Sequence, residues 1–142
     1  MRVPARPGFW SRAAMVAASV VSAGCASAES DIALVVANRG AEPLRCLVVF
    51  GHWVTADVPV FGPGASATVT LRRDSVEHSL FVPRSSDGRR MMVEDLACDR
   101  DAAWGQSLVH VGLDPVRQGT GTRYEVACDL DGGAGCGAPT EP

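Results

Sequence analysis

The sequence predicts a small all-β protein, a single antiparallel β-sandwich of about seven strands that is stapled by disulfides. Short apolar runs with period-two alternation recur along the chain, and clusters of Gly, Pro, Asn and Ser separate them every dozen residues or so. Three cysteines lie in the region that carries these runs, and a fourth follows it closely. No long helical period is present, so a helical or mixed fold is not expected.

The first residues have the pattern of a bacterial secretion signal. Arg2, Arg6 and Arg12 form a positive start, and an uncharged run of twelve residues follows at 13–24. As a helix this run would rise about 18 Å, which is short of the roughly 30 Å hydrocarbon core of a membrane. Residues 1–24 are therefore predicted to be a signal peptide and not a lasting transmembrane span.

Two cleavage sites compete at the end of the signal. Val21-Ser22-Ala23-Gly24-Cys25 resembles a lipobox, which would leave Cys25 as an acylated N-terminus. Ala26-Ser27-Ala28 before Glu29 is an A-x-A site for ordinary signal peptidase, and it would give a soluble periplasmic protein. The lipoprotein interpretation is favoured, with residues 25–31 as a tether to the membrane, although Ser22 stands where an aliphatic residue is usual.

Cysteine parity supports export under either alternative. Five cysteines are an odd number, but Cys25 is assigned to lipid or lost with the signal, which leaves an even set of four: Cys46, Cys98, Cys128 and Cys136. An even set suits an oxidising compartment such as the periplasm. Two disulfides are predicted.

The mature chain is acidic. All thirteen basic residues are Arg, and loss of the signal leaves ten of them against sixteen acidic residues, a formal charge of −6. This balance disfavours binding to nucleic acid or to anionic lipid through charge alone. The expected link to the membrane is the lipid on Cys25.

The predicted domain spans residues 32–130, and each strand follows from a local apolar run. In the second run Leu44, Cys46, Val48 and Phe50 share one face, so this strand is expected to be central with Cys46 pointing inward. One helical turn is expected around Asp99 to Trp104. The seven predicted strands cover residues 34–37, 44–54, 67–71, 77–82, 90–96, 107–113 and 122–130.

The last twelve residues, 131–142, form a predicted Gly/Pro-rich tail with almost no apolar surface. Its only anchor is Cys136. A bond to Cys128 would close a short loop, whereas a bond to Cys98 or Cys46 would hold the tail across the domain. An inter-sheet bridge from Cys46 to Cys98 or Cys128 is favoured for the core, but four cysteines permit three connectivities, and spacing does not select one.

Two turns carry a resemblance to a known class of domain. Asn38-Arg39-Gly40-Ala41-Glu42-Pro43-Leu44 joins the first two runs, and Pro63-Gly64-Ala65-Ser66-Ala67-Thr68-Val69-Thr70-Leu71 leads into the third. In this order they resemble the immunoglobulin-like domains of bacterial exported and surface proteins, including the adhesion-related type. The resemblance covers about 40 of the 142 residues. It implies an immunoglobulin-like sandwich, and its motifs concern turns and not an active site.

Histidine and methionine are the first residues to consider for a metal. His52, His78 and His110 lie on three different predicted strands, and the side chains of neighbouring Met91 and Met92 point to opposite faces. The pattern therefore does not demand a metal site, and no metal or cofactor is expected. Cys-x-x-Cys and Gly-x-Ser-x-Gly motifs are absent from the sequence, and no enzymatic activity is predicted.

Aromatic residues remain as contacts for a partner. Three residues are candidates for such a contact: His52 and Trp53 at the end of the second predicted strand, and Trp104. The alternative places Trp53 under the connection at 57–61 or inside the second sheet layer.

The leading functional hypothesis is a non-catalytic envelope module that contacts another, unidentified envelope protein. The first rival is a periplasmic copper or zinc carrier that uses the histidines with a methionine. The second rival is a small exported enzyme or inhibitor, which would need a cleft or a projecting loop at 57–66.

Overall fold

The computed structural model describes residues 28–142. The signal peptide and the lipidation site Cys25 lie outside the described residues. Within them the chain is almost entirely β: nine strands pair into one continuous, strongly folded sheet, with three short helical turns. The strands are β1 (Glu29–Asn38), β2 (Leu44–Phe50), β3 (Thr55–Phe61), β4 (Ser66–Asp74), β5 (Ser79–Pro83), β6 (Arg90–Arg100), β7 (Val109–Val111), β8 (Arg123–Asp129) and β9 (Gly135–Cys136).

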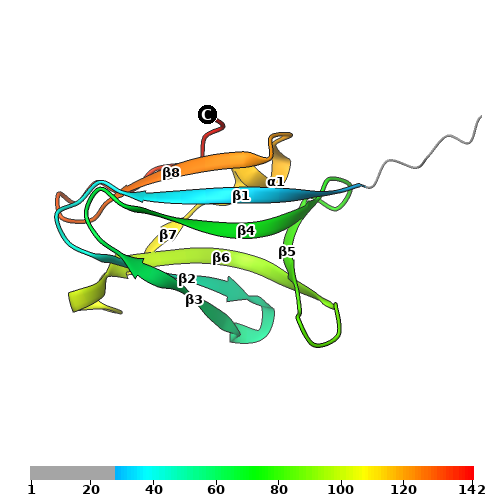
Figure 1. Ribbon diagram of the computed structural model, residues 1–142, viewed down its shortest axis with the longest axis horizontal. Coiled ribbons are helices and arrows are strands. Elements are labelled where there is room, and N and C mark those ends of the chain that lie inside the picture. Colours follow the sequence, from blue (N-terminus) through cyan, green and yellow to red (C-terminus); the bar gives the residue numbers. More distant parts are fainter. Residues whose placement is uncertain (1–27) are drawn as a thin grey trace, which may run out of the picture.

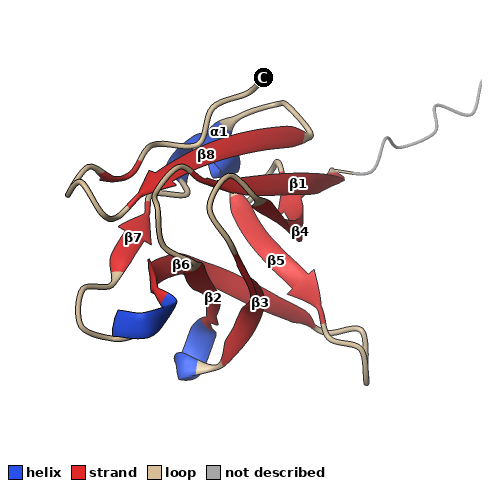
Figure 2. Ribbon diagram, turned by 60° about the vertical axis from the view of Figure 1, so that its left-hand side comes forward, coloured by secondary structure: helices blue, strands red, loops and turns tan. Residues whose placement is uncertain are grey.

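The sheet folds into two layers that face each other (Figure 1). One layer contains β4, β1, β8 and β9, and the other contains β3, β2, β6 and β7. Strand β5 links the layers, because it pairs with the end of β4 on one side and with the first residues of β6 on the other (Figure 2). Most neighbours are antiparallel, and β1 and β8 run parallel.

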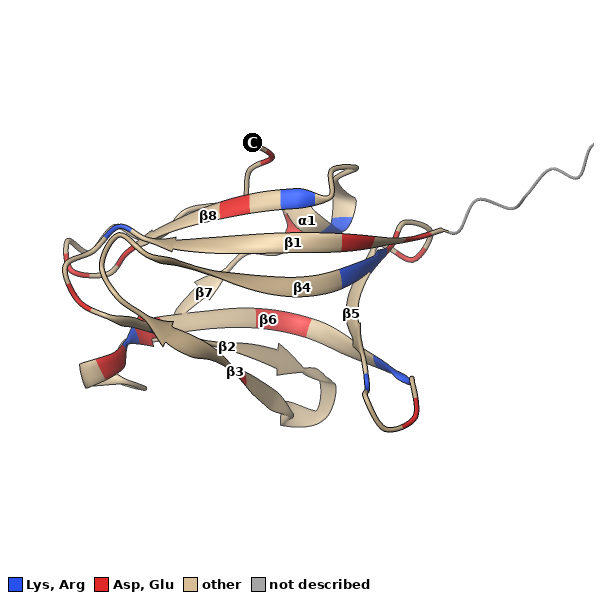
Figure 3. Ribbon diagram, in the orientation of Figure 1, with Lys and Arg blue, Asp and Glu red and all other residues tan. Residues whose placement is uncertain are grey.

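Alternation explains which side chains fill the space between the layers. In β2 the buried residues are Leu44, Cys46, Val48 and Phe50, as the period of two predicts. Tyr124, Val126 and Cys128 of β8 are buried in the same way. The middle of β1, β2 and β4 carries no charge, whereas β6 and β8 carry acidic residues within the strand (Figure 3).

The prediction of seven strands is wrong. The predicted strand at 44–54 ends at Phe50, where the three-residue turn η1 (Gly51–Trp53) reverses the chain into β3. The run at 57–61 contains Pro59, which the sequence reasoning placed in a connection, but β3 is an edge strand and an edge tolerates proline. The ninth strand, β9, lies in the predicted tail. Its two residues pair with the end of β8.

The remaining elements are short. The helical turn expected near Asp99 is confirmed as η2 (Asp101–Ala103). A five-residue helix, α1 (Asp114–Gln118), begins after Leu113 and buries Val116. The predicted strand at 77–82 starts later, because residues 75–78 form a turn in which the backbone amides of Val76 and Glu77 donate to the Asp74 carboxylate.

The C-terminal residues pack on the domain. Beyond β9, Thr140 exchanges two backbone hydrogen bonds with Glu125 of β8, at 2.8 and 3.0 Å. Pro139 is buried between these contacts. The tail is therefore held at the β8 edge of the sheet. Backbone hydrogen bonds hold it there, although the tail has few apolar side chains to bury.

Candidate functional site

The β2–β3 turn has an unusual backbone. His52 and Trp53 both have positive φ values, 64° and 63°, and the Phe50 amide donates to the Val54 carbonyl at 2.7 Å. Two consecutive left-handed residues are typical of a type I′ hairpin turn, where Asn-Gly is the usual pair. Bulky residues in this conformation cost about 1 to 2 kcal/mol each. We refer to residues 51–54 as the hairpin tip.

The hairpin tip exposes apolar surface. The Trp53 side chain is 92% exposed, and Val54 is 50% exposed. The alternative in which Trp53 packs beneath a connection or between the layers is therefore wrong: the left-handed turn directs the indole into solvent. An exposed tryptophan held on a short rigid turn is a typical anchor for a protein partner.

A cavity of about 510 Å³ lies beside the hairpin tip, between it and the start of β6. His52 and Val54 line it from the tip, and Met91 and Met92 line it from β6. Arg84, Arg90 and Glu94 supply charge at its wall. We define the tip surface as His52, Trp53, Val54, Met91 and Met92.

The three histidines do not meet. His52 lies at the hairpin tip, whereas His78 lies in the turn between β4 and β5 with a φ of 51°. His110 lies on β7, and its Nδ1 is within hydrogen-bonding distance of the Asp95 carboxylate. The two methionines, which we expected to point apart, border one cavity together with His52.

The other residues proposed as contacts have structural partners. Trp104 follows η2 and is partly buried, and the Arg45 guanidinium lies 4.8 Å from its ring centroid.

The stretch at 57–66, which a hydrolase or inhibitor would have to project as a loop, is strand β3 and a four-residue connection to β4.

Two disulfides use all four cysteines of the described chain, which confirms the expected number. Cys46 bonds Cys98, and Cys128 bonds Cys136. Each bridge joins directly opposed residues of neighbouring strands, β2 with β6 and β8 with β9. One of the two favoured partners of Cys46, Cys98, is therefore confirmed. The expected inter-sheet placement of this bridge is wrong, because Cys46 and Cys98 lie opposite each other in adjacent strands.

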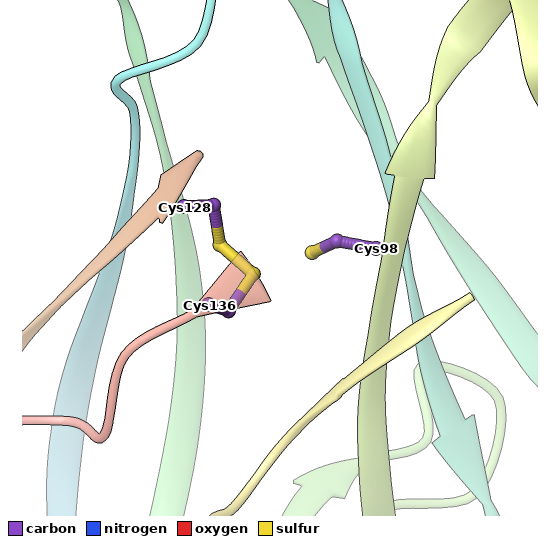
Figure 4. A group of neighbouring side chains, drawn as sticks. All are labelled: Cys98, Cys128 and Cys136. Atoms are coloured by element: carbon purple, nitrogen blue, oxygen red, sulfur yellow. A yellow bond between two sulfur atoms is a disulfide. The ribbon is translucent and has the colours of Figure 1, made fainter. Parts of the chain in front are cut away.

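The two bridges nevertheless approach each other between the layers. The Cys98 sulfur points towards the Cys128–Cys136 bond (Figure 4). The sulfurs of Cys98, Cys128 and Cys136 all lie within 4.8 Å of one another, and this is the only group of metal-ligating His, Cys, Asp or Glu side chains found among residues 28–142. Oxidised to disulfides, these sulfurs are not thiolate ligands.

A buried polar cluster closes the layer of β4, β1 and β8. Arg73 is 3% exposed, and its guanidinium donates to the carbonyls of Val116 and Gly121 at 3.1 and 3.0 Å. It also donates to the Tyr124 hydroxyl at 3.2 Å, and that hydroxyl donates to Glu141 at 2.7 Å. We call Arg73, Tyr124 and Glu141 the polar cluster.

The polar cluster shifts two pKa values. The hydrogen bond from Tyr124, followed by that from the Gly121 amide, lowers the pKa of the Glu141 carboxyl. Burial, reinforced by the bond to Glu141, raises the pKa of the Tyr124 hydroxyl. The carboxylate is thus held ionised and the phenol neutral, which suits a structural link between the C-terminus and the core.

Sequence reasoning missed the polar cluster. Arg72-Arg73 reads as a solvated strand end, but alternation along β4 turns Arg73 inward and leaves Arg72 to pair with Asp31. The one signal available was Tyr124, the only tyrosine of the chain, which lies in an alternating run and needs a buried partner for its hydroxyl.

The comparisons with known proteins returned nothing: no protein-family model, no curated protein and no solved structure matches this chain. Among residues 28–142, every helix is too short and too polar to cross a membrane.

Proposed function

We propose that this protein is an exported, lipid-anchored module of the bacterial envelope, an immunoglobulin-like β-sandwich that binds another protein through its tip surface. The N-terminal pattern that ends at Cys25 supports export and lipid attachment. Two disulfides support an oxidising compartment. The two-layered arrangement of the strands supports the sandwich (Figure 1).

One observation carries the binding role: Trp53 is 92% exposed on a turn whose two central residues are left-handed. A turn selected for stability alone would carry Asn-Gly at these positions. Backbone strain that coincides with an exposed aromatic side chain is typical of a binding site. The adjoining cavity offers a partner side chain an apolar seat between Val54 and the two methionines.

The partner should therefore present an apolar groove for the indole and one side chain for the cavity. Arg84, whose side chain is 50% exposed, favours a carboxylate on that side chain, whereas Arg90 already pairs with three carboxylates of this chain. No catalytic step is part of this proposal, and the tip surface acts by contact alone.

Site-specific photo-crosslinking in intact bacterial membranes tests the proposal. A photoreactive residue at position 53 is expected to capture one envelope protein as a discrete adduct, and Trp53→Ala with the photoreactive residue at position 54 is expected to lose it. The matched control is position 60, because Val60 is also 50% exposed but lies on β3, away from the tip. Equal or absent crosslinking at 53 and 60 would contradict the proposal.

Intact mass of the protein purified from membranes tests the anchor separately. A chain that starts at Cys25 with added lipid supports the lipoprotein, and its mass should rise by four protons on reduction. A chain that starts at Glu29 without lipid supports the alternative, a soluble periplasmic protein cleaved after Ala28.

A second candidate function is favoured by the lining of the cavity. His52, Met91 and Met92 offer one imidazole and two thioethers, which are donors that suit Cu(I) better than Zn(II). In this alternative the protein carries copper in the periplasm. Competition of the purified protein with a Cu(I) chelator should show one site that His52→Ala or Met92→Leu removes, while His78→Ala leaves it intact. If the wild-type protein competes with the chelator no better than His52→Ala does, the copper site is rejected.

A further inference from the structure

The two disulfides form a closely packed pair. They come from opposite layers, with Cys98 on β6 and Cys128 on β8, and the Cys98 side chain points towards the Cys128–Cys136 bridge (Figure 4). Three of the four sulfurs lie within 4.8 Å of one another. A thiolate at Cys128 would thus lie within 4.8 Å of the Cys98 sulfur of the other bridge, and thiol–disulfide exchange requires such an approach.

The two bridges differ in access. Cys46, Cys98 and Cys128 are fully buried, at 0% exposed, whereas Cys136 is half-buried on the two-residue strand β9. A cavity of about 230 Å³ borders this strand and is lined in part by Val109, Leu130 and Gly135. A small thiol from solvent therefore reaches the Cys136 sulfur first.

We propose that the two bridges are coupled by internal thiol–disulfide exchange, so that reduction at Cys136 moves the remaining bridge to Cys98–Cys128. A dithiol attacks the Cys136 sulfur through one thiolate, the Cys128–Cys136 bond breaks, and Cys128 leaves as a thiolate. The Cys128 thiolate attacks the Cys98 sulfur. The Cys98–Cys128 bond forms, and Cys46 leaves as a thiolate that takes up a proton.

The dithiol completes the reaction. The second thiolate of the dithiol attacks the dithiol sulfur that is bonded to Cys136. The dithiol closes to a cyclic disulfide, and Cys136 is released as a thiol. The dithiol has lost two electrons, and the protein has exchanged two bridges for one bridge and two thiols, at Cys46 and Cys136. The new bridge joins the two layers. No disulfide then holds β9 and the residues after it against β8. This device is independent of the tip surface.

The variant Cys136→Ser isolates the internal step, because it leaves Cys128 with no partner in the otherwise oxidised chain. The full exported protein is purified under oxidising conditions, held near pH 8, alkylated with iodoacetamide and mapped by mass spectrometry after digestion. We expect on the order of a tenth or more of the alkyl label on Cys46, together with a peptide pair linked through Cys98 and Cys128. Exchange should slow about tenfold per unit as pH falls below the thiol pKa.

The matched control is Cys128→Ser/Cys136→Ser, which has no initiating thiol and should keep Cys46–Cys98 without label. Label confined to Cys128 in the single variant, with Cys46–Cys98 intact and a circular dichroism spectrum like that of the wild type, would overturn the proposal. Should Cys136→Ser fail to fold, the wild type treated with less than one equivalent of dithiothreitol decides: a Cys98–Cys128 linked peptide is expected, and only original bridges or fully reduced pairs would contradict it.

Discussion

The polar cluster and the hairpin tip each contain a side chain in an energetically unfavourable position, and they differ in how far hydrogen bonds compensate for it. The Arg73 guanidinium is buried, but it donates to two carbonyls and to the Tyr124 hydroxyl. Trp53 is a large apolar side chain, and it is 92% exposed on a left-handed backbone. At the polar cluster, hydrogen bonds offset the burial of the Arg73 guanidinium at its two terminal nitrogens, and only its Nε has no partner. At the hairpin tip, neither His52 nor Trp53 forms a side-chain hydrogen bond or ion pair within residues 28–142.

This difference separates the residues that stabilise the fold from the residues that the fold exposes for binding. Substitutions at the polar cluster remove partners from buried groups and should lower the free energy of unfolding, whether or not a binding partner is present. Substitutions at the hairpin tip should leave or even raise stability, and should act on binding alone. Four predictions test this separation.

The largest effect is expected from the bridge that ties the strand carrying the tip. Cys46 and Cys98 are separated by 52 residues, whereas Cys128 and Cys136 are separated by 8. Because loop-closure entropy grows with loop length, Cys46→Ala/Cys98→Ala should lower the free energy of unfolding by about 4 kcal/mol and Cys128→Ala/Cys136→Ala by about 2.5 kcal/mol. Urea denaturation of both variants measures the difference. Equal losses would mean that the lost packing, and not the loop length, determines the effect.

The next effect is at the polar cluster. Arg73→Met leaves the Val116 carbonyl, the Gly121 carbonyl and the Tyr124 hydroxyl short of a donor, and it should cost about 3 kcal/mol or more in unfolding free energy. The neighbouring Arg72→Met removes a solvent-exposed ion pair with Asp31 and should cost less than about 1 kcal/mol. Denaturation midpoints of the two variants should therefore differ clearly. Similar midpoints would show that Arg73 does not hold the layer together.

The hairpin tip should respond in the opposite direction. His52→Asn/Trp53→Gly supplies the residues that the turn prefers and should stabilise the protein by about 1 to 2 kcal/mol. Trp53→Ala, which keeps the left-handed strain, is the control and should give no such gain. Both variants should lose the crosslinked partner. A loss of stability in the Asn-Gly variant would show that the tip residues contribute to the fold. It would contradict the separation between stabilising residues and binding residues.

The smallest effect is the pH dependence of the polar cluster. The pKa of Glu141 is lower in the folded chain, so its contribution to stability is present above its ordinary pKa and is lost as pH falls through the folded value. Between about pH 6 and pH 3 the unfolding midpoint of Glu141→Gln should fall less than that of the wild type. Glu42→Gln, at an exposed residue, is the control. Parallel pH curves for Glu141→Gln and the wild type would argue against the link.

Burial patterns were predictable where they depended on neighbours in the chain. Alternation along residues 44–50 correctly placed Cys46, Val48 and Phe50 in the core, because a strand turns successive side chains to opposite faces whatever its partners are. Cysteine parity correctly predicted two disulfides. The candidate site was predicted in part: Trp53 and His52 were named as contacts, but the left-handed turn that carries them was not predicted.

Register, pairing and buried charge were decided only by the tertiary structure. The sequence permitted three cysteine connectivities, and the opposition of Cys46 with Cys98 in neighbouring strands selected one. The hairpin at His52-Trp53 was read as a continuous strand, because neither residue normally adopts a left-handed turn. Met91 and Met92 meet His52 across a cavity only because the pairing of Phe50 with Val93 places the start of β6 beside the end of β2. Each of these depends on contacts between residues distant in the chain, for which local apolar periodicity carries no information.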